Sequence, residues 1–327
     1  MTPARIDLHC HTLHSVDHWR VALPQGAELS IPFYPSLAPC AAYDLALSRG
    51  MTHVTFTDHD TLAGCLEVLA THPRPAHLVM GEEVSCYDGG ECLHVGVYGL
   101  SVEDHEAIHA GSERTDRERS CLRWQLEELL AYCEERELAY DLKHPLWSLR
   151  AEGPPPTLLR RWLGLFARVE AINGTRHPRL NTLGQTLAER LGPRGVAFTG
   201  GSDSHTSRIG QAWTATEGAT PAEIVASLRA GRCSAGGSHG SHHELDADTR
   251  TCLVSNITGR AGHFSALAQD YMHKMPLVAQ DLGDWLVSAG VLWAVLNEYR
   301  RQRALARAAE TAFAAELAAG ELVDAGA

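Results

Sequence analysis

Short apolar runs alternate with segments of helical periodicity from the N-terminus to about residue 234. Strands are predicted at 5–9, 53–57, 77–82, 94–98, 138–141, 169–172 and 196–199. Helices are predicted at 39–48, 62–70, 120–136, 157–163, 180–191 and 221–230. This alternation is typical of an α/β architecture, with helices packed on the sheet between successive strands.

Two stretches do not follow this pattern. Residues 19–38 contain Pro24, Pro32 and Pro35 and are expected to be a long irregular loop near the site. Beyond residue 245 the chain becomes rich in alanine and helical in pattern. We therefore expect a first domain over 1–245 and a helical extension over 246–327, whose role the sequence does not indicate.

Polar segments come directly after several predicted strands. They are His9-Cys10-His11, Thr57-Asp58-His59-Asp60, Gly81-Glu82-Glu83, Lys143-His144-Pro145 and Asp203-Ser204-His205. Side chains alternate along a strand, so those of His9 and His11 project to the same side, about 7 Å apart. The carboxyl ends of barrel strands are where active sites form in α/β barrels. The sequence thus predicts one site built from several strand ends.

The residue types in these segments are metal ligands. The candidates are His9, His11, Asp17, His59, Glu83, His94, His144, Asp203 and His205. Imidazole and carboxylate ligands without thiolate suit Zn, Mn or Fe. Nine ligands exceed the needs of one ion, so we expect two or three divalent ions that share a carboxylate. Glu83 is the bridging candidate, with Glu82 as the alternative.

Composition restricts partner and compartment. The formal net charge is −12, which argues against a protein that holds a nucleic-acid backbone. A small anionic substrate stays possible because bound divalent cations would invert the local potential. Nine cysteines without a C-x-x-C pair favour a reduced cytoplasmic protein. The longest apolar run, 285–296, is too short to span a membrane and is expected to pack on the barrel or in a homo-oligomer.

The motifs together resemble the PHP (polymerase and histidinol phosphatase) superfamily over about residues 4–235. They are Asp7-Leu8-His9-Cys10-His11-Thr12 with Ser15 and Asp17, Thr57-Asp58-His59-Asp60, Gly81-x-Glu83, His94, Lys143-His144-Pro145 and Gly201-Ser202-Asp203-Ser204-His205. The resemblance implies a distorted seven-stranded (β/α) barrel. It also implies a division of the ligands: His9, His11, Glu83 and Asp203 for one metal; Glu83, His94 and His144 for a second; Asp17, His59 and His205 for a third. His14 or His18 could replace Asp17.

The activity implied by the resemblance is metal-dependent phosphoesterase chemistry, in which a metal-bridging hydroxide attacks phosphorus. Uncatalysed phosphate-monoester hydrolysis requires enhancements of up to ~10²¹, and a general acid or base contributes only ~10²–10⁴. Metals are therefore expected to supply most of the effect. His205 or His59 is expected to supply a proton to the leaving group through bound water. Lys143 and Arg208 are the candidate phosphate contacts, although Arg208 could equally pair with a carboxylate.

The favoured substrate is a small phosphomonoester, such as a nucleotide, sugar or histidinol-type phosphate, with no nucleic-acid or membrane partner. Three alternatives stay open. One is a nuclease or phosphodiesterase of the same superfamily. Another is an amidohydrolase, in which Lys143 would be modified and bridge the metals. The last is a non-catalytic module stabilised by metal. Histidines outside the motifs, among them His105 and His109, are expected to be ordinary surface or core residues.

Overall fold

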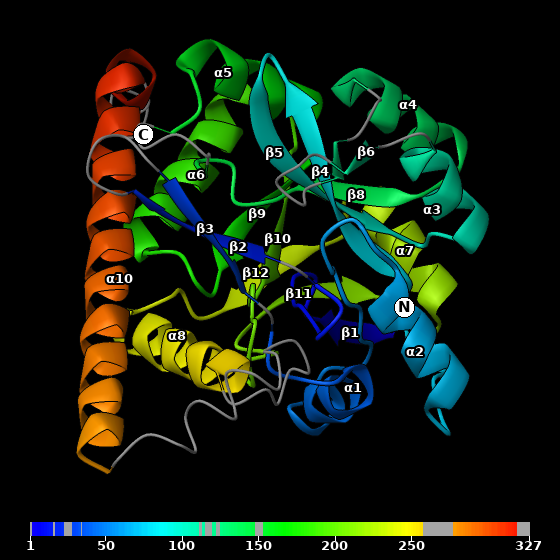
Figure 1. The fold of residues 1–327 in the computed structure, drawn as a ribbon. Helices are drawn as coiled ribbons and strands as arrows, with labels where there is room; N and C mark the ends of the chain where they lie inside the picture. Colours follow the sequence, from blue (N-terminus) through cyan, green and yellow to red (C-terminus); the bar gives the residue numbers. More distant parts are fainter. Residues whose placement is uncertain are drawn as a thin grey trace.

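The computed structural model describes residues 2–15, 17–22, 28–33, 35–110, 113–114, 120–121, 125–147, 153–257 and 277–318. These residues form a mixed α/β fold in which helices surround two sheets (Figure 1). No helix in this part of the chain is both long and apolar enough to cross a membrane.

The larger sheet has five strands in the order β10-β9-β8-β5-β4. Their bounds are β4 Gly81–Asp88, β5 Glu91–Tyr98, β8 Ala139–Leu142, β9 Arg168–Asn173 and β10 Ala197–Gly201. Strands β4, β5 and β8 pair antiparallel, whereas β8, β9 and β10 pair parallel. The sheet is therefore mixed, with its antiparallel part at the β4 edge.

The smaller sheet has three antiparallel strands in the order β1-β11-β12, with bounds Pro3–Ile6, Ala212–Glu217 and Ser234–Gly237. Isolated parallel bridges join Cys10 to Ser204, Val54 to Leu78 and His59 to Glu83. The expected distorted seven-stranded (β/α) barrel is not shown, since the described strands form no closed barrel. The segment predicted as a strand over 53–57 contributes a single bridge, because its backbone hydrogen bonds to neighbouring segments are too few for a ladder.

Two further hairpins complete the strands. Strands β2, Asp17–Ala22, and β3, Glu28–Phe33, pair antiparallel, so the irregular loop expected over 19–38 is wrong for the described residues there. Short strands β6, Glu113–Arg114, and β7, Ser120–Cys121, form the other hairpin.

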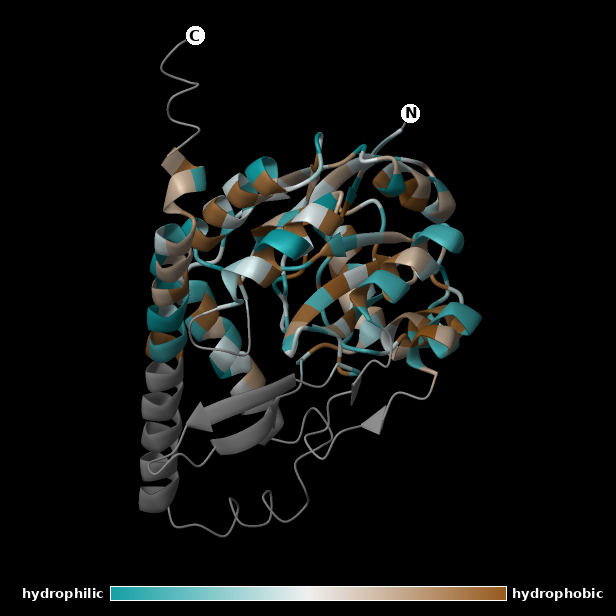
Figure 2. Ribbon diagram, turned by 90° about the horizontal axis from the view of Figure 1, so that it is seen from above, coloured by the Kyte–Doolittle hydropathy of each residue, from teal (hydrophilic) through white to brown (hydrophobic). Residues whose placement is uncertain are grey.

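The helices follow the predicted order, with one addition. They are α1 Pro39–Ser48, α2 Ala63–Thr71, α3 Val102–His109, α4 Leu126–Glu135, α5 Pro156–Leu165, α6 Pro178–Leu191 and α7 Pro221–Arg229. The additional helix is α3, whose first turn is fixed by a capping box between Ser101 and Asp104. These helices carry hydrophobic and hydrophilic residues, as amphipathic helices that cover a sheet do (Figure 2).

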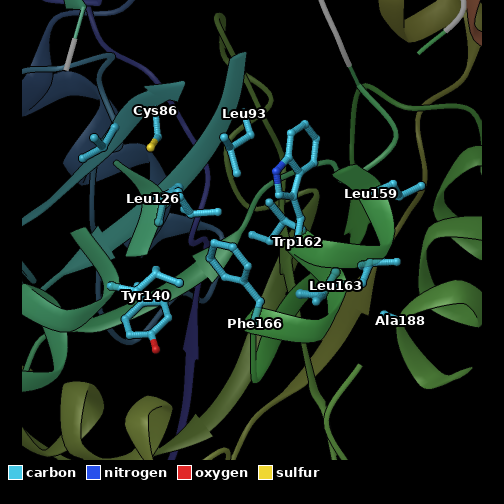
Figure 3. Close-up of a cluster of buried hydrophobic side chains, with 14 of the residues drawn as sticks. Cys86, Leu93, Leu126, Tyr140, Leu159, Trp162, Leu163, Phe166 and Ala188 are labelled. Carbon is cyan, nitrogen blue, oxygen red and sulfur yellow. The ribbon is translucent and has the colours of Figure 1, made fainter. Parts of the chain in front are cut away.

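The main hydrophobic core lies between the five-stranded sheet and helices α4, α5 and α6. Trp162 and Phe166 from α5 and its end lie beside Leu93 of β5 and Tyr140 of β8 (Figure 3). Trp162 also donates a hydrogen bond from Nε1 to the Asp88 carboxylate at 2.7 Å. This core covers one face of the sheet and leaves its strand ends for the polar residues described below.

Two C-terminal helices, α8 His242–Ile257 and α10 Leu277–Ala312, follow the sheets. Helix α10 runs along one side of the molecule beside α6 (Figure 1). Its Leu305 and Ala306, and Phe313 just beyond it, belong to the same buried cluster as Trp162. A boundary at 245/246 falls inside α8, and it stays a prediction.

Candidate metal centre

The two polar motifs that are farthest apart in the sequence lie side by side in the fold. Cys10 forms its bridge with Ser204, the backbone N–H of His11 donates to the Ser204 carbonyl at 2.9 Å, and that of Asp203 donates to the His9 carbonyl at 2.6 Å. The approach is close enough that a Cβ added at Gly201 would lie 2.2 Å from the His9 Cβ. A glycine is therefore required beside His9.

Asp7 connects these two motifs through hydrogen bonds to its side chain. Its buried carboxylate accepts backbone N–H groups from His9 at 3.1 Å, Ser202 at 2.9 Å and Gly210 at 2.7 Å. Burial raises the pKa of Asp7, and these hydrogen bonds oppose the rise. Asp7 thus acts as an acceptor that fixes the backbone on both sides of the site.

Glu83 lies at the centre of the predicted ligands. Its Oε1 is 2.8 Å from His94 Nδ1 and 3.3 Å from His144 Nε2. Its Oε2 is 3.1 Å from His9 Nε2, 3.4 Å from His11 Nε2 and 3.4 Å from His59 Nδ1. Burial alone would raise the pKa of Glu83, but the surrounding histidines hold it well below its usual range. Glu83 is thus an ionised carboxylate shared by five imidazoles.

Asp203 forms the opposite wall. Its Oδ1 lies 3.5 Å from Nε2 of both His9 and His11 and 3.9 Å from Nδ1 of His205. Its backbone has a φ of +51°, and that of His144 a φ of +23°, which non-glycine residues seldom adopt. Such strain persists where the surrounding structure holds it, commonly at functional sites.

The imidazoles differ in their access to solvent. The side chains of His9 and His11 are fully buried, whereas those of His59 and His205 are 12% and 14% exposed. His11 lies between them, with ring centroids 4.8 Å from His59 and 4.3 Å from His205. Burial, with the charge of His205, lowers the pKa of His11 to about 3. A substrate would therefore approach from the side of His59 and His205.

The donor set fits divalent cations. His94 Nδ1 and Glu83 Oε1 are 2.8 Å apart and buried, yet neither makes a hydrogen bond of normal geometry with any described residue, and the same holds for His11 Nε2. Four groups of ligand atoms here lie within 4.8 Å of one another: His9, His11 and Glu83; His59, Glu83 and His94; His9, His144 and Asp203; and His11, His59 and His205. Buried imidazole and carboxylate atoms that converge in this way are suited to divalent cations.

Glu83, not Glu82, faces this cluster. Successive residues of β4 point to opposite sides, so the Glu82 carboxylate contacts His105 and His109 instead. Asp17 begins β2, but its side chain, like that of His18, is outside the described residues. His14 points away and pairs with Glu67 at 2.7 Å.

Lys143 lies beneath the site instead of lining it. Its fully buried Nζ donates to the Leu8 carbonyl at 2.9 Å and to Asp141 at 3.1 Å, and is 3.7 Å from Glu170. This geometry disfavours contact with a phosphate and also a metal-bridging role. The Arg208 guanidinium pairs with Glu244 and, at 3.5 Å, with Asp248, both on α8. That pairing is the alternative that the sequence left open.

Glu170 of β9 is a site residue that the sequence analysis did not identify. It accepts from His9 Nδ1 at 2.8 Å, from the His144 backbone N–H at 3.0 Å and from Asn173 Nδ2 at 2.9 Å. Burial alone would raise its pKa, but His9 and Lys143 lower it to about 2. The sequence gives one signal for Glu170: it is a carboxylate within the apolar strand predicted at 169–172, where a charged side chain is unusual.

A small pocket opens beside His144. Its walls include Trp147, Arg176 and Leu180, with Gln302 and Leu305 from α10. Trp147 packs against the rings of His94 and His144, with centroids 4.7 and 5.3 Å away. Arg176 Nη2 is 3.4 Å from Asp203 Oδ2. An aromatic face and a guanidinium therefore adjoin the candidate ligands.

Comparisons with known proteins were made on sequence and on fold. A family model described as PHP-associated matches residues 178–233. No curated protein matches the chain. Among solved structures, Endonuclease Q in complex with a 27-mer duplex containing an abasic lesion has a TM-score of 0.50 at 16% identity. The match covers 73% of this chain and 60% of that one.

Two other similar structures are less alike in fold. One is from Bifidobacterium adolescentis and is assigned as a metal-dependent phosphoesterase, with a TM-score of 0.42 at 15% identity, covering 61% of this chain and 87% of that one. The other is an amidohydrolase from Chromobacterium violaceum with bound sulfate, with a TM-score of 0.43 at 16% identity, covering 62% and 87%.

The expectation of a small phosphorylated substrate without nucleic acid is contradicted by Endonuclease Q, a protein of similar fold with duplex DNA at its active site. The net charge of −12 was a poor guide because it sums over the whole chain. The potential at a site depends on the groups and cations nearby.

The resemblance found in the sequence agrees with the family model that matches residues 178–233. The motifs that resemble it occur in order along the chain, and the structure brings their side chains together around Glu83. The PHP-associated match covers α6 to α7 and includes Asp203 and His205. The chain thus resembles the PHP (polymerase and histidinol phosphatase) superfamily, and a PHP-associated family model matches part of it.

Proposed function

We propose that this chain is a metal-dependent phosphoesterase. The observation that carries the proposal is the convergence of five imidazoles on the ionised Glu83 carboxylate, with Asp203 opposite. Two or three cations of the Zn, Mn or Fe type would be held by His9, His11, His59, Glu83, His94, His144, Asp203 and His205. When bound, they would lower the pKa of water and neutralise phosphoryl oxygens.

The protein groups have separate roles in this proposal. His59 and His205, the more exposed imidazoles, would supply a proton to the leaving oxygen through bound water. Arg176 replaces Lys143 and Arg208 as the proposed phosphate contact, because its side chain is 17% exposed and lines the pocket. A guanidinium suits phosphate through paired N–H donors.

As substrate class we propose a nucleic-acid phosphodiester. Support comes from the substrate of Endonuclease Q and from Trp147 beside the candidate ligands. Aromatic side chains stack on nucleobases with ~1–3 kcal/mol per base and tolerate any sequence.

The test compares three substrates with Mn²⁺-loaded protein and its Asp203→Ala variant. They are a single-stranded oligonucleotide, a duplex with an abasic site, and a chromogenic phosphomonoester. Cleavage of either nucleic acid that the variant lacks supports the proposal. Hydrolysis of the monoester alone would overturn the substrate class but not the phosphoesterase activity, and no hydrolysis by metal-loaded protein would overturn both.

The amidohydrolase alternative loses support from the placement of Lys143, which is hydrogen-bonded to Leu8 and Asp141 and is directed away from the cluster. An amide substrate panel in the same assay provides the direct comparison. Activity there without phosphoester hydrolysis would favour that alternative.

A further inference from the structure

A second group of possible metal ligands lies on the opposite face of β4. The Glu82 carboxylate is fully buried, and its Oε2 is 2.8 Å from His105 Nδ1 and 3.3 Å from His109 Nε2. The three ligand atoms lie within 4.8 Å of one another. None of these residues belongs to the cluster around Glu83.

The local structure explains why the two histidines meet. They are four residues apart on α3, so both project from the same face of the helix, and their ring centroids are 4.6 Å apart. The buried Ile108 anchors α3 in the main core, and the Ser101–Asp104 capping box fixes its start. The helix thus presents both imidazoles to Glu82.

Unused hydrogen-bonding capacity suggests a ligand. Glu82 Oε1 and His109 Nδ1 are buried and make no hydrogen bond with any described residue. A buried polar atom left without a partner destabilises the fold. These two unpaired atoms and the short contacts between Glu82 and the two histidines leave a place for a cation among the three side chains.

We propose that Glu82, His105 and His109 bind a divalent transition cation of the Zn²⁺ type, separate from the metals held around Glu83. Two imidazoles and a carboxylate are a common donor set for Zn²⁺, and three protein ligands leave a position for water. The cation fastens α3 to β4 directly behind Glu83. This site does not depend on the proposed phosphoesterase activity.

The experiment counts bound zinc in the full chain. Metal-depleted protein is loaded with Zn²⁺, passed through a desalting column and measured by inductively coupled plasma mass spectrometry. We expect the His105→Ala/His109→Ala variant to retain one equivalent less than the parent, with a smaller rise in Tm on zinc addition. The control, His72→Ala, removes a helix-end histidine that pairs with Asp44 and retains the parent count. Equal counts in the parent and the double variant would overturn the proposal.

Glu82→Gln provides a second variant that preserves side-chain shape while removing the charge, and it is expected to lose the same equivalent. Should these variants not fold, Asp203→Ala protein is treated with diethyl pyrocarbonate with and without Zn²⁺, and peptides are mapped by mass spectrometry. Zinc-dependent protection of His105 and His109 supports the site. Equal modification with and without zinc would mean that Glu82 only pairs with the two histidines, and it would overturn the proposed zinc site.

Discussion

His9 Nδ1 lies 2.8 Å from Glu170 Oε1, and this contact directs His9 Nε2 towards Glu83 and Asp203. A carboxylate that holds one nitrogen of a ligating histidine fixes the ring and increases the basicity of the other nitrogen. The strength of the metal site therefore depends on a residue that donates no atom to it.

Replacing Glu170 with glutamine removes this charge without changing the shape of the side chain. We expect Glu170→Gln to weaken Mn²⁺ or Zn²⁺ binding about 10- to 100-fold, measured by calorimetric titration. The control is Glu189→Gln, an exposed carboxylate on α6 that pairs with Gln185. Unchanged affinity in Glu170→Gln would show that His9 needs no partner.

Arg176 and Arg179 provide a matched pair for substrate binding. Arg176 lies between Asp203 and Glu298 at the pocket, whereas Arg179 pairs with Glu310 at the surface. Because a hydrogen bond to a charged group contributes about 1.5–3 kcal/mol, Arg176→Ala should raise KM for the cleaved substrate about 10- to 100-fold. Metal content is measured in parallel, since Arg176 contacts Asp203. A comparable rise in Arg179→Ala would contradict this assignment.

Lys143 is expected to support the structure of the site. Lys143→Met leaves Asp141 and Glu170 buried without their cation, which should lower the free energy of unfolding by about 3–5 kcal/mol in urea titrations. Arg307→Met, on the exposed face of α10, should have little effect. A variant of unchanged stability with a raised KM would instead restore Lys143 as a phosphate contact.

Gly201 is expected to tolerate no side chain. A Cβ there would lie 2.2 Å from the His9 Cβ and 2.6 Å from the His9 backbone nitrogen. Gly201→Ala should therefore displace His9, lower stability by about 1–3 kcal/mol and reduce bound metal. Gly164→Ala on α5, where the nearest atom is 4.0 Å from the added Cβ, should be stabilising. If both variants keep full metal content, the close approach of Gly201 to His9 does not position the His9 side chain.

The environment of Asp104 is expected to make the free energy of unfolding depend on pH. Burial disfavours its charged form, but hydrogen bonds from the Ser101 backbone N–H and hydroxyl, Arg136 and Tyr132 to the carboxylate hold its pKa below the usual value. A folded-state pKa that is lowered contributes stability above the unfolded pKa, and the contribution is lost as the pH falls through the folded value. Asp104→Asn should thus be about 1–2 kcal/mol less stable at pH 7, with the difference shrinking below about pH 4. A difference that stays constant between pH 7 and pH 3 would contradict this.

Much of the secondary structure could be predicted because its signals are local. Helix α1 has the predicted bounds, since Pro39 starts it and Gly50, with a φ of +84°, follows its end. Helix α3 was not predicted: it has eight residues, and its polar composition gives no clear apolar stripe. The strands β11 and β12 were also missed, and β12 consists only of Ser, Ala and Gly, which resemble a loop.

The sequence alone determined which residue types could serve as metal ligands and that they follow strand ends, because motif spacing and period-two alternation are local properties. Only the tertiary structure decided that Asp7 and Ser202, 195 residues apart, share a hydrogen bond, and that Lys143 is buried. It also decided which face of β4 turns Glu83 towards the cluster and Glu82 towards α3. Strand pairing and helix packing between distant segments fix these contacts, and the residues concerned carry no local signal of their partners.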